Sequence, residues 1–501
     1  MKIGRKQSGV SEEINVPQRI AIIGAGVGGL ACACRLAKDG YSVDVYEKLA
    51  SPGGRNNIIN DQGFKFDTGP SFVLMPDFFQ EVFSYCGENI NDYLNLKTID
   101  PSYKIIYPDG DCLTVHKDSN RTKNEIERIE KGSSQQFDKF IAETKNIYEV
   151  IRPLLYECVT LKSLLDPRFW FIFPQIHAFE SYWQLAKKYF KSQKLCYAFT
   201  FEAMFMGVSP YQAPAFYSVI TYTDHAQKIA HPLGGMYQIP LALEKMAKKF
   251  GAKFHYNCEV KDINKKNKQF SLKINGENIL ADTVVVNADY AYAQESLLKR
   301  KIPKFKYSCS VYLIYLGLNK KLKNLSHHNL FFADNLDKNL DEIFNQRVVS
   351  QDPSFYVHVP TVTDASLADE GKEIAYILVP VPNLENDNNK FLDYEAGIRK
   401  TVFQKINQLA GCDLESLIEV EHKFYPEDFI KRYNLKNGAT FGLAHNLTQS
   451  AFMRPQNFDT LIPGLYFVGA STQPGGGLPV VIAGSRIVAD LIRKKEKRAG
   501  T

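Results

Sequence analysis

Three glycines near the start of the chain have the spacing of a dinucleotide-binding loop. They are Gly24, Gly26 and Gly29, and they follow an apolar run at residues 20–23. The first glycine permits a tight turn, the second lets the backbone approach a pyrophosphate, and the third lets a helix pack close to a strand. The backbone N–H groups at the start of that helix would hold the phosphates. The pattern therefore predicts a site for a dinucleotide cofactor.

The elements around these glycines complete the same pattern. Residues 30–37 are small and apolar enough for a closely packed helix, and residues 41–46 alternate as a second strand that ends on Glu47. An acidic residue about 20 positions after the glycines suits a ribose hydroxyl pair better than a 2′-phosphate. A strand, a helix and a second strand in this order predict an α/β fold with a Rossmann-type nucleotide domain.

Two glycine-rich turns could supply the remaining contacts of such a cofactor. Residues 51–55 read Ser-Pro-Gly-Gly-Arg, which places Gly54 and Arg55 near the phosphates; an ordinary surface arginine is the alternative. Near the C-terminus a buried strand at 465–468 leads through a second glycine-rich turn into a helix, whose first N–H groups can stabilise negative charge. A purely structural turn is the alternative there. The candidate contacts of this turn are Gly469, Ala470, Gly477, Pro479 and Val480.

The chain also returns to the nucleotide domain in its middle. We expect a helix at 237–250, a strand at 253–260, a hairpin with an Asn-Gly turn at 275–276 and a buried strand at 281–289. The backbone of Val260 would then contact the adenine, a position that the fold sets and the side chain does not.

A second sheet and a helical insertion are predicted between these parts. Residues 102–115 and 305–385 alternate as strands of a substrate-side β-sheet domain, and residues 134–237 have helical periodicity. Within this helical region, residues 164–173 are highly apolar and four lysines follow at 187–194. Aromatic residues beside a basic helix suit a membrane-facing surface, and a buried core with a solvated lysine face is the alternative.

Length and composition set further limits. The chain has 501 residues, which is long for a single hydrophobic core. Its formal charge of +6 does not indicate nucleic-acid binding. We expect five segments: a dinucleotide-binding domain in three parts (18–100, 231–300 and 456–493), a helical and membrane-associated region (101–230) and a substrate domain (301–455).

Targeting and metal signals are absent from the sequence. Residues 1–17 are polar and charged, so no signal peptide is expected, and there is no uninterrupted apolar run of about 18 residues for a spanning helix. The nine cysteines are scattered without metal-ligand spacing, which indicates reduced thiols in a cytoplasmic protein. His327 and His328 are adjacent and cannot both face one metal from one element, so we expect a surface or cap position for them and no metal.

Together these motifs resemble the bacterial phytoene desaturase family, the carotenoid-forming branch of the flavin-containing amine oxidase superfamily. Residues 53–55, Gly-Gly-Arg, followed by Phe66-Asp67-x-Gly69-Pro70, resemble amine-oxidase-type flavoproteins more than nicotinamide dehydrogenases. The resemblance spans nearly the whole chain. The other residues on which the resemblance rests are the glycine loop with Glu47, His327-His328, and residues 341–345, 362–368, 447–450 and 469–479.

The resemblance implies an FAD enzyme that introduces double bonds into phytoene by hydride transfer to flavin. It also implies a hydrophobic polyene substrate, oxygen or quinone as final acceptor, and peripheral attachment to the inner face of the cell membrane. Gln473 stands where many members have His, so a C30 diapophytoene desaturase or a carotenoid oxygenase or isomerase is the alternative. A non-catalytic lipid-binding escort protein is a more remote one.

No catalytic side chain can be assigned from the sequence. Asp67 and Glu202 are polar candidates, with a structural role as the preferred interpretation. We expect residues 201–222, rich in Phe, Met and Tyr, to line part of an apolar substrate tunnel.

Overall fold

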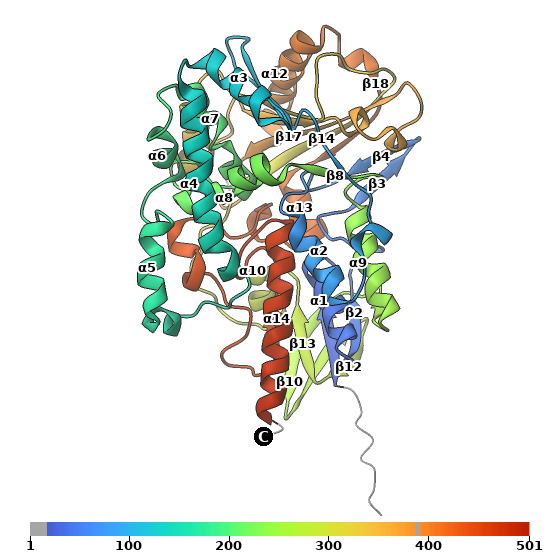
Figure 1. Ribbon diagram of the computed structural model, residues 1–501. Helices are drawn as coiled ribbons and strands as arrows, with labels where there is room; N and C mark the ends of the chain where they lie inside the picture. Colours follow the sequence, from blue (N-terminus) through green and yellow to red (C-terminus); the bar gives the residue numbers. More distant parts are fainter. Residues whose placement is uncertain (1–17, 387–390, 500–501) are drawn as a thin grey trace, which may run out of the picture.

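A five-stranded parallel sheet forms the core of the nucleotide domain (Figure 1). The computed structural model describes residues 18–386 and 391–499, so the expectation about residues 1–17 lies outside it. All neighbours in this sheet are parallel, which confirms the Rossmann-type arrangement. In order across the sheet the strands are β19 (Leu465–Phe467), β13 (Thr283–Val286), β1 (Arg19–Ile23), β2 (Ser42–Tyr46) and β9 (Lys253–His255).

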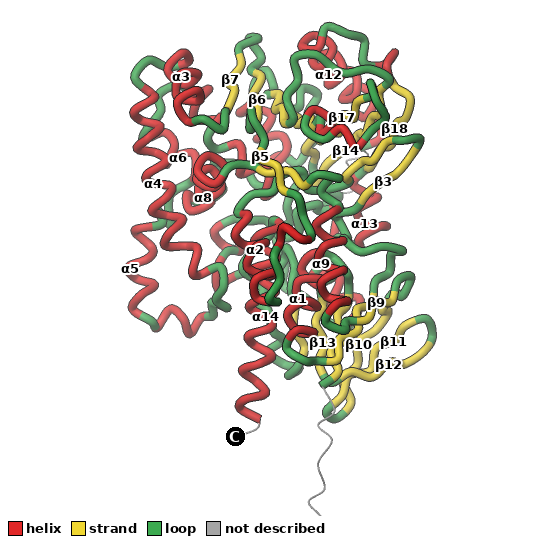
Figure 2. Tube along the Cα trace, turned by 45° about the vertical axis from the view of Figure 1, so that its right-hand side comes forward, coloured by secondary structure: helices red, strands yellow, loops and turns green. Residues whose placement is uncertain are grey.

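Both faces of this sheet are covered, which explains why its central strands β1 and β13 are mostly apolar runs. On β1, Ile20 and Ile22 pack among helices, whereas Ala21 and Ile23 pack against a three-stranded antiparallel sheet. Figure 2 shows this small sheet beside the nucleotide domain, at the side opposite to α5. The helices are α1 (Val27–Lys38), α2 (Pro76–Tyr85), α9 (Gln238–Lys249) and α14 (Leu478–Ala499), and the strands are β10 (Val260–Lys266), β11 (Gln269–Ile274) and β12 (Glu277–Ala281).

A seven-stranded sheet lies at the other end of the molecule and contains the predicted hairpin at 102–115. Alternate residues of its long strand β14 face two different cores: Tyr312 and Ile314 pack toward α12 (Leu392–Ala410), and Leu313 packs toward the helical region. In order across the sheet the strands are β18 (Ile418–Phe424), β14 (Ser310–Leu318), β17 (Glu373–Val381), β16 (Phe355–His358), β15 (His328–Phe331), β6 (Tyr103–Ile106) and β7 (Cys112–Val115).

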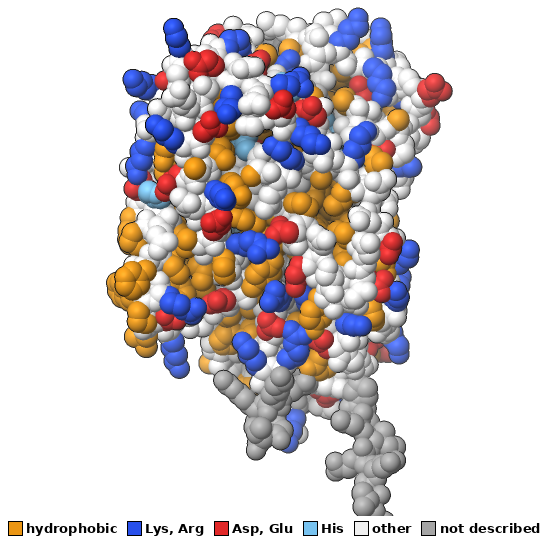
Figure 3. Space-filling view, in the orientation of Figure 1, with side chains coloured by type: hydrophobic (Ala, Val, Ile, Leu, Met, Phe, Trp, Pro, Cys, Tyr) orange, Lys and Arg blue, Asp and Glu red, His pale blue; other side chains and the backbone are white. Residues whose placement is uncertain are grey.

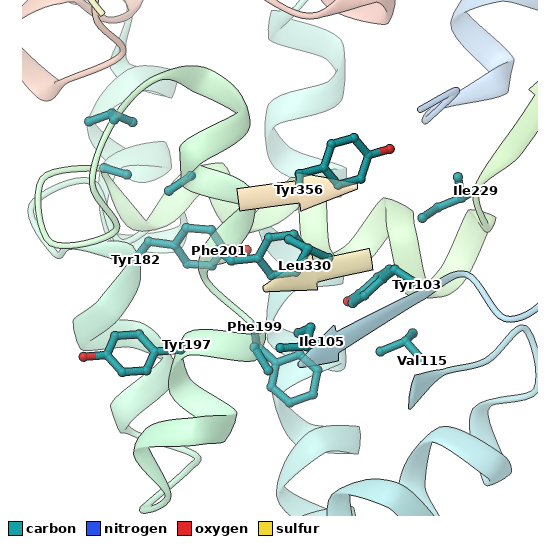
Figure 4. Packing of buried hydrophobic residues seen from close by; sticks show 14 of the residues in the cluster. Tyr103, Ile105, Val115, Tyr182, Tyr197, Phe199, Phe201, Ile229, Leu330 and Tyr356 are labelled. Carbon is teal, nitrogen blue, oxygen red and sulfur yellow. The ribbon is translucent and has the colours of Figure 1, made fainter. Parts of the chain in front are cut away.

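The predicted helical insertion packs on one face of this sheet. In Figure 4, Ile105 of β6 and Leu330 of β15 lie close to Phe199 and Phe201 of the insertion, which belong to the same buried cluster. The insertion contains α3 (Ser119–Ile129), α4 (Ser133–Leu154), α5 (Pro167–Gln175), α6 (Tyr182–Lys187), α7 (Gln193–Ala198) and α8 (Val219–Tyr222). The remaining elements are β3 (Ile58–Asp61), β4 (Phe64–Asp67), β5 (Leu96–Thr98), β8 (Ala230–Pro232), α10 (Tyr290–Tyr292), α11 (Leu336–Asp341) and α13 (Pro426–Tyr433).

Two local predictions differ from the structure. The strand predicted at 253–260 is two strands in two sheets, because the chain turns at Asn257, which has a left-handed φ of +53°. The four lysines at 187–194 do not form one basic helix face. Lys188 pairs with Glu180, and Lys194 of α7 pairs with acidic residues of the β6–β7 turn.

The five-segment division stays a prediction, although the strands of the parallel sheet come from its first, third and fifth segments. Among the described residues, no helix combines the length and the apolar character that crossing a membrane requires.

Candidate functional site

The glycine loop between β1 and α1 is too close to its surroundings for larger residues. A Cβ on Gly26 would lie 2.7 Å from the side-chain nitrogen of Asn287, and a Cβ on Gly29 would lie 2.2 Å from the carbonyl oxygen of Gly24. Gly24 itself has a φ of +98°, which favours glycine. No side chain caps α1, so the first N–H groups of this helix remain available to an anion.

Glu47 lies at the end of β2 and is buried beside this loop. One carboxylate oxygen accepts a hydrogen bond from the N–H of Ala25 at 2.7 Å, and the other accepts from the N–H of Leu49 at 2.8 Å. Burial raises the pKa of Glu47, and these N–H donors oppose the rise. The carboxylate therefore holds the loop in place and keeps lone pairs for a further donor such as a ribose hydroxyl.

The Gly-Gly-Arg turn packs directly on the glycine loop. The N–H of Gly53 donates to the carbonyl of Ala25 at 2.8 Å, and a Cβ on Gly54 would lie 3.4 Å from the Cα of Gly26. The Arg55 guanidinium donates to the carbonyl of Thr440 and lines the same cavity as the loop. Burial lowers the pKa of Arg55, and the nearby carboxylate of Asp289 opposes this effect.

The C-terminal turn before α14 forms the opposite wall. His445 fixes this turn, because its Nε2 accepts from the N–H of Gly476 at 2.9 Å and its Nδ1 donates to the carbonyl of Met206 at 3.1 Å. Burial lowers the pKa of His445 well below its ordinary value, so the ring is neutral. Helix α14 begins at Leu478, directly after this turn.

Gln473, the position that departs from the family pattern, joins this turn to the helical insertion. Its amide oxygen accepts from the N–H of Val159 at 2.9 Å, and its amide nitrogen donates to the carbonyl of Val159 at 2.7 Å. The same nitrogen donates to the carbonyl of Ala451 at 3.0 Å. A glutamine amide is both acceptor and donor, so it can bind both backbone groups of one residue.

Asn287 and Asp289 also belong to the site, and sequence reasoning did not select them. Asn287 directly follows β13, donates to the carbonyl of Gly24 at 3.2 Å and lines the cavity. Asp289 faces Arg55 and accepts a hydrogen bond from Ser471 at 3.3 Å. Ligands in such sheets bind at the carboxyl ends of the strands, so the polar residues at the end of the strand predicted at 281–289 were a usable signal.

One continuous cavity of about 880 Å³ joins these groups to an apolar end. Every candidate cofactor residue named from the sequence lines it except Gly29, which packs the helix against the loop. The predicted tunnel segment 201–222 contributes to the apolar end. Side chains there include Ile172 and Phe173 of α5, Met204, Phe205, Phe216 and Ile220.

The two carboxyl candidates, Asp67 and Glu202, are not among the described residues that line this cavity. Asp67 accepts from the N–H groups of Met236 at 2.8 Å and Tyr237 at 3.0 Å, which fixes the start of α9. Burial raises the pKa of Asp67 to about 6 and that of Glu202 to about 8. Glu202 lies in the core of the helical insertion beside Tyr182. The contacts of Asp67 and Glu202 fit a structural role for both carboxyl groups.

The surface or cap position expected for His327 and His328 is wrong. Both side chains are fully buried, because β15 is an interior strand and both of its faces are covered. His328 stacks on Phe72 with ring centroids 4.0 Å apart, and its Nδ1 is 2.6 Å from the hydroxyl of Tyr356. Phe72 and Tyr356 both line the cavity.

This fold and site define a dinucleotide-binding oxidoreductase with a large apolar substrate chamber. The flavin containing amine oxidoreductase family matches residues 27–493. The chain is 40% identical over 489 residues to a zeta-carotene-forming phytoene desaturase of Myxococcus xanthus, covering 94% of this chain and 93% of that protein. It is 34% identical to a 4,4'-diapophytoene desaturase of Staphylococcus aureus, with coverages of 94% and 98%. An oxidoreductase from Methanosarcina mazei shares the fold, with a TM-score of 0.65, 17% identity, and coverages of 94% and 100%.

The chain belongs to the flavin containing amine oxidoreductase family, within the branch of phytoene and diapophytoene desaturases. It is an FAD-dependent oxidoreductase of the type that acts on CH–CH groups. The residues present fit this cofactor, because the glycine loop leaves no room for side chains and the uncapped α1 start can face a pyrophosphate.

Proposed function

We propose that this protein desaturates a hydrophobic carotenoid precursor, with phytoene as the first candidate. The observation that carries the proposal is the single cavity that connects the glycine loop and Arg55 with an apolar chamber. The relatives named above act on phytoene and diapophytoene. A polyene hydrocarbon offers no hydrogen-bonding groups, and a chamber lined by Phe, Met, Ile and Leu side chains requires none.

We assign the cofactor contacts as follows. The loop of Gly24, Gly26 and Gly29 and the start of α1 hold the pyrophosphate, Glu47 accepts from the ribose, and the Val260 backbone contacts the adenine. Gly54 and Arg55 contact the phosphates from the other side. The turn residues Gly469, Ala470, Gly477, Pro479 and Val480 face the flavin end.

When bound, FAD supplies the hydride acceptor, because no side chain of this chain can accept one. The protein binds and orients the substrate and excludes water from the chamber. No base is assigned; of the titratable side chains that line the cavity, neutral His445 is engaged with two backbone groups, and Asp289 is engaged with Arg55 and Ser471.

We further propose that the chamber is filled from a membrane surface. Helix α5 has two sides, with Ile172 and Phe173 lining the cavity and Phe171 73% exposed. Leu165, just before α5, is 83% exposed, and Phe179, just after it, is 84% exposed. Figure 3 shows the resulting apolar surface at the left edge of the molecule, over α5. Exposed aromatic and aliphatic side chains on a short helix suit insertion into the membrane interface.

This membrane contact differs from the one expected from the sequence. Lys188 and Lys194 are engaged in ion pairs with carboxylates, so the apolar side chains and not a basic helix would carry the attachment. All nine cysteines are unpaired, which supports a reducing compartment and hence the inner face of the cell membrane. Oxygen or a membrane quinone remains the proposed electron acceptor.

The experiment is expression of the full chain in cells that make either phytoene or diapophytoene, followed by mass analysis of the extracted pigments. We expect one precursor to lose two hydrogens per new double bond. Diapophytoene conversion with phytoene unchanged would establish the C30 alternative. If the purified protein contains FAD but leaves both precursors unchanged and converts a coloured carotene, the desaturase proposal is refuted in favour of an oxygenase or isomerase. A protein that binds no flavin would indicate the lipid-escort alternative.

A further inference from the structure

Three histidines that are far apart in the sequence meet in the interior of the protein. They are His231 of β8, His327 immediately before β15, and His358 at the end of β16. One ring nitrogen from each lies within 4.8 Å of the other two. Each of the three side chains is at most 1% exposed. None of them is among the described residues that line the cofactor and substrate cavity, so this cluster is separate from the flavin site.

The hydrogen bonds of the cluster leave its ring nitrogens incompletely used. The Nε2 atoms of His327 and His358 are 2.9 Å apart. The ring of His231 makes no short hydrogen bond among the described residues; its nearest polar neighbour is a carboxylate oxygen of Asp364, 3.5 Å from its Nε2, which interacts with it electrostatically. A buried polar group that lacks a well-formed hydrogen bond destabilises the fold, so the imidazole of His231 has a nitrogen left for a further ligand.

We propose that His231, His327 and His358 bind a divalent transition-metal ion, with zinc as the first candidate. Imidazole nitrogen is a preferred ligand of zinc and of the neighbouring metals of the first row. Zn–N bonds of about 2.0–2.1 Å require nitrogens about 3.3 Å apart. The two closer nitrogens would therefore move slightly apart, and His231 would move toward them.

The surroundings match those of a metal site. The Nδ1 of His327 is 2.7 Å from the hydroxyl oxygen of Thr363. The Nδ1–H group can donate a hydrogen bond to this oxygen, which leaves the lone pair of Nε2 for the metal. Asp364 supplies a negative charge beside His231, and it is held by the N–H of Gly234 at 2.6 Å.

Such an ion would join the two halves of the molecule. Strand β8 leads into α9 of the nucleotide domain, whereas His358 belongs to the seven-stranded sheet and His327 immediately precedes strand β15 of that sheet. The cluster is also next to His328, whose ring stacks on that of His358 with centroids 5.2 Å apart and contacts the cavity-lining Phe72. The role we infer is structural: the ion holds the sheet that carries the substrate chamber against the segment that returns to the cofactor domain.

The test is metal analysis of the full-length flavoprotein, purified without chelators or metal-affinity resins. We expect about one zinc or similar ion per chain by mass spectrometry, as for a structural site. Protein stripped by a chelator should lose thermal stability and regain it with Zn²⁺, and with Co²⁺ it should show visible d–d absorption. The variants His327→Gln and His231→Gln should each lose the ion, whereas His177→Gln, at a half-buried histidine paired with Glu143 and Glu180, should retain it.

The wild-type measurements keep the proposal testable even if the histidine variants do not fold. Wild-type flavoprotein that contains no stoichiometric transition metal, and that gains neither stability with Zn²⁺ nor a Co²⁺ absorption band, would refute the site. The three rings would then be a buried histidine cluster that holds no metal. Because these measurements follow the metal and not the pigment products, their outcome is independent of the proposed desaturase activity.

Discussion

The apolar surface around α5 makes a quantitative prediction about membrane binding. Leu165 and Phe171 are the side chains to change, because both are largely exposed and neither is among the described residues that line the cavity. Replacing both with serine should therefore weaken membrane attachment without altering the substrate chamber.

The size of the effect follows from the exposed fractions. Full burial of a Leu or Phe side chain is worth about 1.5–3 kcal/mol. Leu165 is 83% exposed and Phe171 is 73% exposed, so their transfer from water into the interface should contribute about 3 kcal/mol in total. Because about 1.4 kcal/mol corresponds to a tenfold change, the double variant should partition onto vesicles about 100-fold more weakly.

The assay is co-sedimentation of the FAD-loaded protein with lipid vesicles over a range of lipid concentrations. The matched control is Leu280→Ser on β12, an exposed leucine on the side of the molecule opposite to α5. It should leave binding unchanged. Attachment should also persist at high salt, since apolar contacts are not screened. The thermal unfolding midpoint should change little in every variant, because these side chains are exposed in the folded protein.

Vesicle binding by the Leu165→Ser/Phe171→Ser double variant that equals wild type, with the flavin retained, would refute the reasoning. The α5 surface would then serve another purpose than lipid contact. Binding that disappears at high salt would instead assign the attachment to charged side chains.

Three further substitutions test the cofactor site and the core. Arg55→Ala should weaken FAD binding about 10- to 100-fold, because a charged hydrogen bond is worth about 1.5–3 kcal/mol. The control Arg121→Ala, at an exposed arginine, should leave FAD binding unchanged. If FAD titration gives the same affinity for Arg55→Ala as for wild type, Arg55 does not contact the phosphates. Gly29→Ala places a Cβ against a backbone carbonyl and should lower the unfolding midpoint. The control Gly397→Ala, in α12, should raise stability by up to about 1 kcal/mol. A Gly29→Ala variant more stable than Gly397→Ala would contradict the packing described for the glycine loop. Burial raises the pKa of Glu202 from 4.5 to about 8, so the unfolded chain releases a proton that the folded protein keeps, and stability falls as pH rises through that window. Between pH 5 and 8, Glu202→Gln should remove about 2–4 kcal/mol of this loss of folding stability, as measured by denaturant unfolding. If the variant and wild type lose stability equally over this pH range, the Glu202 carboxyl does not titrate there.

Much of the cofactor site could be predicted because its determinants are close together in the chain. The tight turn at Gly24, the close helix contact at Gly29 and the acidic end of the second strand all lie within a single strand–helix–strand unit. Steric limits on backbone and Cβ atoms act over a few residues, so the spacing of glycines predicts this geometry directly.

The substrate chamber was only partly predictable, because its wall is assembled from distant segments. Ile172 of α5, Met204 of the insertion and Leu313 of β14 line one cavity although more than a hundred residues separate the first from the last. Apolar periodicity shows that such residues are buried or face lipid, and it does not show which of them meet. The apolar stretch at 164–173 illustrates this, since one side of its helix faces the cavity and the other is exposed.

The histidines show most clearly what could not be predicted from the sequence. From the sequence alone, neighbouring His327 and His328 can only be assigned to opposite sides of one element, because side chains alternate along a strand. That both sides are buried follows from the position of β15 between two other strands, and the approach of His231 and His358 follows from the packing of β8 on the sheet. Local sterics and residue spacing therefore predicted the dinucleotide site, and the family resemblance of the motifs indicated FAD and the class of reaction. Long-range packing, which no short stretch of sequence encodes, decided the shape of the chamber and the histidine cluster.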